Sequence, residues 1–167
     1  MTVTETRKDL EGLTLSFVAE FDAPIERVWD LWADPRKLER WWGPPGYPAT
    51  FTSYDFTEGG QVSYHMTGPD GSTPKGWWTI TAIHAPRSME FDDGFADDAG
   101  NKVEEYGSSH VVVTLEPHGS GTRMTLTSRF ESREQFDTMA EMGMEEGMRL
   151  AMGQMDAVLA ESVGSQA

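Results

Sequence analysis

Residues 13–32 read LTLSFVAEFDAPIERVWDLW, and the hydrophobic pattern of this stretch changes its period halfway along. Apolar residues first alternate with polar ones up to Phe21, which predicts a strand with one buried face. Asp22 and Pro24 then offer an N-cap and a first-turn proline, and apolar residues recur at helical spacing through Trp32. The stretch therefore predicts a strand that leads directly into a helix.

The chain that follows predicts one more short helix and then a series of strands. Asp34 and Pro35 open that helix, and a Gly-Pro-Pro-Gly run at residues 43–46 ends it. Segments of strand composition, separated by Gly, Pro and Asp turns, follow at residues 49–56, 61–67, 76–83, 88–91, 108–116 and 122–130. We expect residues 92–107, which are rich in acids and glycines, to form a solvated, mobile loop.

A long C-terminal helix completes the predicted domain. Ser132 and Gln135 form a candidate capping box that opens it, and its apolar stripe of methionines and other residues runs to about Glu161. The order of elements predicts an α+β fold with a curved antiparallel sheet of about seven strands, one face of which the terminal helix covers. We expect a single domain over residues 13–161, with flexible tails at 1–12 and 162–167.

Composition excludes several classes of function. The chain has 167 residues and a net charge of −15, from 13 Lys and Arg against 28 Asp and Glu, which argues against binding to nucleic acids or to anionic membranes. The absence of cysteine excludes disulfides and thiolate chemistry. The polar N-terminus does not resemble a signal peptide, and no stretch approaches the roughly 18 apolar residues of a membrane span, so we expect a cytoplasmic protein.

Several motifs resemble a known superfamily. Residues 21–29 are similar to the start of START-like, or helix-grip, domains, and the Trp-Trp-Gly-Pro at 41–44 resembles a signature of the activator of heat-shock-protein-90 ATPase homologues. Further similar motifs lie at residues 55–60, 115–117 and 121–126. The resemblance implies two short helices after the first strand and a sheet wrapped around the long C-terminal helix. Thr57 and Met148 depart from the residues common in that family, so no family ligand is carried over.

A cavity between the sheet and the terminal helix is the predicted ligand site. Strand alternation turns one set of aromatic and serine side chains toward the helix, and methionine suits a surface that adapts to apolar shapes. Ordinary core packing is the competing interpretation for each of these residues. The candidate lining residues are Trp41, Trp42, Tyr64, Trp78, Phe91, Ser109, Ser128, Met144, Met148 and Met152.

Three functions remain open from the sequence. The leading interpretation is a non-enzymatic protein that binds a small hydrophobic or aromatic molecule, with no cofactor or metal, because the four histidines lack metal-ligand spacing. The second is an enzyme of the cyclase, aromatase or hydratase kind, with Tyr64, Glu90 and Ser128 as candidates. Glu90 has the outward strand parity, and a cavity carboxyl group with a raised pKa would favour this second interpretation.

The third function is a stress-response or chaperone-interaction module, by resemblance to the co-chaperone. The Asn/Trp/His-rich motif of that co-chaperone's own N-terminal domain does not occur in this chain. A homodimer is compatible with all three functions, and sequence does not decide between a monomer and a dimer.

Overall fold

A single antiparallel sheet forms the frame of the protein in the computed structural model, which describes residues 3–105 and 107–166, with side chains to residue 161. Its eight strands lie in the order β1-β2-β8-β7-β6-β5-β4-β3. Their bounds are β1 Val3–Asp9, β2 Thr14–Phe21, β3 Ala49–Tyr54, β4 Gln61–Met66, β5 Lys75–His84, β6 Ser88–Ala96, β7 Ser108–His118 and β8 Gly121–Arg129. The predicted α+β fold with a curved antiparallel sheet is confirmed, with one strand more than expected.

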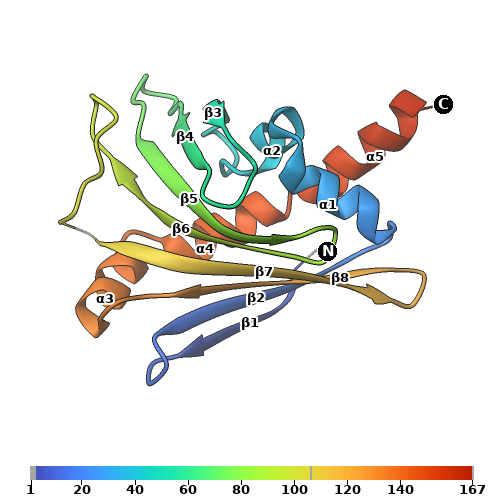
Figure 1. Ribbon diagram of the computed structural model, residues 1–167, viewed down its shortest axis with the longest axis horizontal. Helices are drawn as coiled ribbons and strands as arrows, with labels where there is room; N and C mark the ends of the chain where they lie inside the picture. Colours follow the sequence, from blue (N-terminus) through green and yellow to red (C-terminus); the bar gives the residue numbers. More distant parts are fainter. Residues whose placement is uncertain (1–2, 106, 167) are drawn as a thin grey trace.

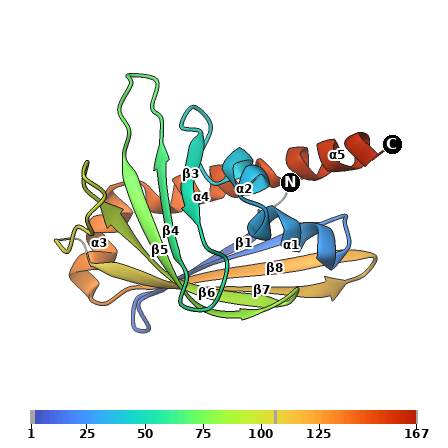
Figure 2. The same ribbon diagram turned by 45° about the horizontal axis from the view of Figure 1, so that its top comes forward.

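Helices cover one face of this sheet. Two short helices follow β2, and three segments follow β8: α1 Ile25–Ala33, α2 Pro35–Trp41, α3 Arg133–Glu141, α4 Met144–Met152 and α5 Met155–Gln166. Figure 1 and Figure 2 show α4 and α5 running one after the other along the concave side of the sheet, with α1 and α2 near α5 and with α3 at the opposite end. None of the described helices has the length and apolar character needed to span a bilayer.

The first strand lies where the sequence led us to expect a flexible tail. Residues 3–9 form β1, which pairs antiparallel with β2, so the prediction of a tail is wrong for this segment. Its side chains are mostly exposed, and only Val3 is buried. The strand forms because its backbone completes the free edge of β2, and such pairing leaves no hydrophobic alternation in the sequence. At the other end, α5 extends to Gln166, beyond the helix end expected near Glu161.

The predicted single terminal helix is divided into three. Gly143 has a φ of 84°, a left-handed conformation that stops α3 and turns the chain before α4 begins. Ser132 caps α3 as expected, with its hydroxyl accepting from the Gln135 backbone N–H at 3.0 Å. Gln135 does not complete the capping box, because its side-chain oxygen accepts from the backbone N–H of Glu131 instead.

An aromatic cluster fills the part of the grip below α1 and α2. Its members are fully or almost fully buried, and they come from both helices and from the central strands: Trp32, Trp41, Trp42, Trp78 and Phe91. Trp78 and Phe91 stack with ring centroids 4.0 Å apart, and Trp41 meets Trp32 edge-on at 4.8 Å. Close packing of such large side chains fills the space between α1, α2 and the central strands.

Candidate functional site

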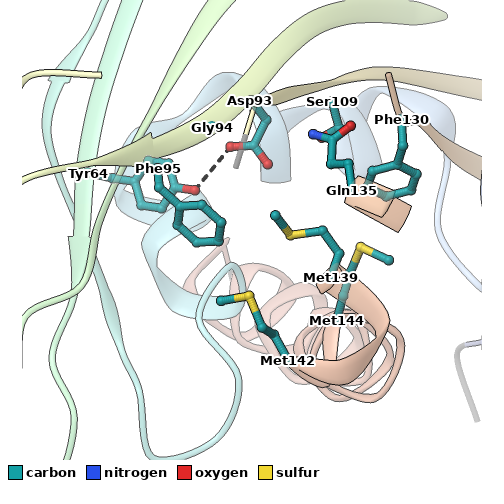
Figure 3. A pocket seen from close by; sticks show the side chains of 11 residues that line it. Tyr64, Asp93, Gly94, Phe95, Ser109, Phe130, Gln135, Met139, Met142 and Met144 are labelled. Atoms are coloured by element: carbon teal, nitrogen blue, oxygen red, sulfur yellow. Dashed lines mark hydrogen bonds between the residues drawn. The ribbon is translucent and has the colours of Figure 1, made fainter. Parts of the chain in front are cut away.

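A cavity of about 290 Å³ lies away from this aromatic cluster, between the sheet and the helix segments around the α3–α4 break. Its wall is mostly apolar and comes from β4, β6, β7, the residue after β8, α3 and the start of α4 (Figure 3). The lining residues are Tyr64, Asp93, Gly94, Phe95, Gly107, Ser109, Phe130, Gln135, Met139, Met142 and Met144.

Asp93 is the one carboxylic acid among the described residues of this lining. It stands on β6 two residues after Phe91, so it shares the inward face of the strand. Burial raises the pKa of Asp93 to about 7, although a hydrogen bond from Tyr64 acts in the opposite direction. This side chain can therefore be neutral or charged near neutral pH, and it can accept or release a proton there.

Tyr64 reaches Asp93 across an intervening strand. The two residues lie on β4 and β6, with β5 between them, and the Tyr64 hydroxyl donates to Asp93 Oδ1 at 3.2 Å. Gly76 of β5 is the register partner of Tyr64, and a Cβ atom there would lie 2.4 Å from the Tyr64 ring and hydroxyl. The glycine thus leaves room for the phenol to cross β5. Burial and the nearby Asp93 both raise the pKa of Tyr64.

Gln135 closes the α3 side of the cavity. Its amide nitrogen donates to the Ser108 backbone oxygen at 3.0 Å, which ties the first turn of α3 to the start of β7. The Glu131 carboxylate accepts from the Ser108 backbone N–H at 2.9 Å and from its hydroxyl at 3.1 Å. These contacts hold the wall between β7 and α3. Ser109 faces the cavity beside them, and its hydroxyl makes no hydrogen bond to another described residue.

Methionine supplies the remaining side of the wall. Met139 lies on α3, Met142 precedes the left-handed Gly143, and Met144 begins α4. Figure 3 shows all three side chains converging on the space opposite Asp93. Met142 is 56% exposed, so it lies at the mouth of the cavity. Flexible thioether side chains can adapt this wall to apolar groups of different shapes.

The structure separates the residues that the sequence proposed for the site. Tyr64, Ser109 and Met144 line the cavity. Trp41, Trp42, Trp78, Phe91 and Met152 are buried in the core instead, and Met148 packs against it. Ser128 is partly buried on the inward face of β8 but lies outside the lining. The proposal that these side chains touch a ligand was based on strand and helix faces, which do not distinguish filled space from open space.

Asp93 is the most informative residue that the sequence analysis missed. The acidic run after Phe91 was interpreted as a solvated loop, and this is wrong for Asp92 and Asp93, since β6 continues to Ala96. The alternation of Met89, Phe91, Asp93 and Phe95 carried the signal, but the neighbouring acids and Gly94 concealed it. Gln135 was considered only as a capping residue, and Met139 and Met142 were not proposed because the break at Gly143 was not expected.

Glu90, proposed as an alternative catalytic residue, lies on the opposite face of the sheet. Its carboxylate contacts His110 Nε2 at 2.9 Å, and Asp92 contacts His110 Nδ1 at 2.8 Å. Burial lowers the pKa of His110, but the hydrogen bonds and charges of Asp92 and Glu90 outweigh it, so the pKa is raised above 6.5. Within residues 3–105 and 107–166, no cluster of three or more His, Cys, Asp or Glu side chains is arranged to hold a metal ion.

Solved structures of bacterial proteins share this fold. A protein from Arthrobacter aurescens is 59% identical, with a TM-score of 0.93 over 96% of this chain and 93% of its own. A protein from Mycobacterium smegmatis is 45% identical, with a TM-score of 0.88 over 94% and 96% of the two chains. A protein from Silicibacter pomeroyi is 28% identical, with a TM-score of 0.74 over 89% and 99%.

Among curated proteins, none matches this chain. Residues 22–160 match the sequence profile of one protein family, described as "Activator of Hsp90 ATPase homolog 1-like protein". The match includes α1, α2, the sheet from β3 to β8 and most of the terminal helical region. The chain therefore belongs to the family of activator of Hsp90 ATPase homolog 1-like proteins.

Proposed function

We propose that this protein binds one small, largely apolar molecule in the cavity between the sheet and the α3–α4 junction. The single observation that carries the proposal is the cavity itself, with about 290 Å³ of space at the lower end of the range for small-molecule sites. Its wall combines methionine and phenylalanine side chains with a few polar ones, among them the hydrogen-bonded pair Tyr64 and Asp93. An apolar wall with few polar groups is typical of sites that recognise small molecules.

Tryptophan fluorescence provides the first test. The rings of Trp42 and Trp78 lie 6.1 and 6.2 Å from the ring of Tyr64, so a ligand in the cavity would alter the emission of nearby indoles. Titration with naphthylmethanol, a neutral aromatic probe, should give a saturable change with one site per chain. Absence of saturable binding by fluorescence and calorimetry would contradict the proposal.

Two serines offer a matched pair of variants for this test. Ser109 lines the cavity, whereas Ser128 has the same inward orientation on the neighbouring strand but lies outside the lining. Ser109→Leu should fill the space and weaken naphthylmethanol binding, while Ser128→Leu should leave it unchanged. Circular dichroism on both variants verifies that they are folded. Equal loss of binding in the two folded variants would place the probe elsewhere.

The Asp93 carboxyl group favours a second candidate function, an enzyme that moves a proton. A pKa near 7 suits a general base or acid at neutral pH, and the cyclase and aromatase chemistries of the alternative interpretation need such a group. In an isomerisation of an unsaturated ketone, Asp93 would take a proton from one carbon and return it to another. Conversion of a β,γ-unsaturated cyclic ketone to its conjugated isomer, followed by ultraviolet absorbance, tests this, and Asp93→Asn should abolish it.

The family description also motivates a chaperone assay. Stimulation of the ATPase of the host's heat-shock chaperone, together with a pull-down, would support a chaperone-interaction role. A chaperone role that does not use the cavity predicts that Asp93→Asn leaves both properties unchanged. This distinguishes a chaperone role from the two functions that use the cavity.

A further inference from the structure

We propose that the cavity selects lipophilic amines, with the ligand's ammonium group paired to Asp93 and its apolar body against the methionine wall. The inference rests on the proposed function, because it names the chemical class of the molecule that the cavity binds. Three observations lead to it: the free side of the Asp93 carboxyl group, the composition of the wall, and the charge around the mouth.

Asp93 has hydrogen-bonding capacity left over on the cavity side. Its Oδ1 accepts from the Tyr64 hydroxyl, and Figure 3 shows its other oxygen pointing into the space above Met139. No Lys, Arg or His side chain in the described part of the chain forms an ion pair with Asp93. A desolvated carboxylate without a counter-charge is unfavourable, so a ligand cation at this oxygen would supply the missing partner.

The wall is suited to the rest of such a ligand. Phe95 and Phe130 contribute aromatic rings, and Met139, Met142 and Met144 contribute polarisable thioethers around the same space. Aromatic faces attract cations, and thioethers pack well against aromatic groups. A molecule with an amine at one end and an aromatic or aliphatic body would therefore match both the polar and the apolar parts of the wall.

Negative charge lies beside the cavity. A second hollow, of about 220 Å³, shares Gly107 and Gln135 with the cavity and is lined by acids: Glu104, Glu105, Glu131 and Glu134. Lys102 is a cation nearby, but its ammonium lies over the Trp77 ring, 3.9 Å from the centroid. Together with the net charge of −15, this field favours the approach of cations and opposes that of anions.

The ion pair between the ligand's ammonium group and Asp93 sets the pH dependence of binding. Tyr64 and Asp93 are the titratable groups among the described lining residues, the four glutamates line the adjoining hollow, and His110 lies on the other face of the sheet. An ammonium ligand prefers the ionised carboxylate, so its affinity should be highest above pH 7. Below that pH the carboxyl group must first lose its proton, which costs about 10-fold in affinity per pH unit.

Calorimetric titration of three probes of nearly equal shape tests the inference: naphthylmethylamine, naphthylmethanol and naphthoate. At about pH 8, with Asp93 mostly ionised, the amine should bind about 10-fold to 100-fold more tightly than the alcohol, and naphthoate should bind most weakly. Asp93→Asn should reduce the affinity for the amine to that for the alcohol. Asp92→Asn removes the same charge from the adjacent residue on the opposite face, and it should preserve the preference.

The outcomes separate this inference from the proposal on which it rests. Equal binding of amine and alcohol by the unmodified protein, or a preference for the amine that survives Asp93→Asn, would overturn the inference while leaving the cavity proposal intact. Failure of all three probes to bind would overturn both. A preference for naphthoate would show that the cavity selects anions, and would overturn the inference as well.

Discussion

Asp92 and Asp93 are neighbours in β6, and the strand turns their side chains to opposite faces of the sheet. Asp92 is 39% exposed and has a histidine partner, His110, at 2.8 Å. Asp93 faces the cavity, accepts a hydrogen bond from Tyr64, and has a pKa raised to about 7 by burial. Two identical side chains one residue apart thus differ in their solvation and in their partners, because the face of the sheet decides both.

The largest expected difference between the two faces of the sheet is in how much their side-chain packing contributes to the free energy of unfolding. Phe91 is fully buried and stacked on Trp78, so Phe91→Ala should lower the free energy of unfolding by about 3–5 kcal/mol. Glu90→Ala, one residue away on the outer face, loses a partly exposed contact to His110 and should cost about 1 kcal/mol or less. Urea unfolding of both variants measures the contrast. Similar losses in the two variants would show that the outer face contributes as much stability as the core.

Asp93→Asn should stabilise the protein in a pH-dependent manner. At low pH the Asp93 carboxyl group of the parent protein is protonated in both the folded and the unfolded state. Between about 4 and 7 the unfolded form, with a pKa near 3.8, ionises while the folded form does not, so stability falls as pH rises. Above pH 7 the penalty is complete, and the asparagine variant should be more stable than the parent by about 1–3 kcal/mol.

Unfolding in urea at low and at high pH measures this effect, with Asp92→Asn as the matched control. The control variant keeps an oxygen that can accept from His110, and it should not show the gain at high pH. If Asp93→Asn were destabilising by the same amount at both pH values, burial would not be what controls the Asp93 carboxyl group.

The hydrogen bond from Tyr64 should have a smaller effect. Tyr64→Phe removes a donor to the ionised carboxylate, so the pKa of Asp93 should rise above its value of about 7, with a loss of about 1 kcal/mol in stability. Gly76→Ala should produce the same direction of change by displacing the phenol. Carboxyl carbon chemical shifts followed against pH report the pKa. Tyr47→Phe, at an exposed tyrosine, is the control, and a lowered Asp93 pKa in Tyr64→Phe would contradict the expectation.

The smallest effect is expected on the outer face, at His110. Its raised pKa means that protonated His110 stabilises the fold below about pH 6.5, and this contribution is lost as pH rises through the folded-state pKa. His110→Gln should therefore cost up to about 1 kcal/mol at low pH and less at high pH. Thermal unfolding at several pH values measures this, and a larger loss at high pH would be the contrary result.

The periodic elements of the fold were predictable because burial leaves a repeating pattern. The sequence 13–32 correctly indicated β2 followed by α1, and the alternation in β5 and β7 identified their inward faces. β1 gave no such pattern, because an edge strand of mostly exposed residues is held by backbone pairing alone. The break at Gly143 was missed because a methionine stripe continues on both sides of it.

The candidate site was less predictable. Tyr64, Ser109 and Met144 were proposed from their faces and do line the cavity, but Trp41, Trp78, Phe91 and Met152 share those faces and belong to the core. The sequence pattern predicted the inward orientation of both the cavity-lining and the core residues. Whether the space in front of each side chain was already filled depends on helices that are distant in the sequence.

The sequence by itself determined the family, the order of strands and helices from β2 to β8, and which strand residues face the helices, because each of these leaves a local pattern. Only the tertiary structure decided where the open space lies. The tryptophans of α1 and α2 pack against β5 and β6 and fill one half of the grip, while the turn at Gly143 leaves the other half open. The tertiary structure also brings the Tyr64 side chain across Gly76 to Asp93. Desolvation at that place raises the pKa of Asp93 to about 7.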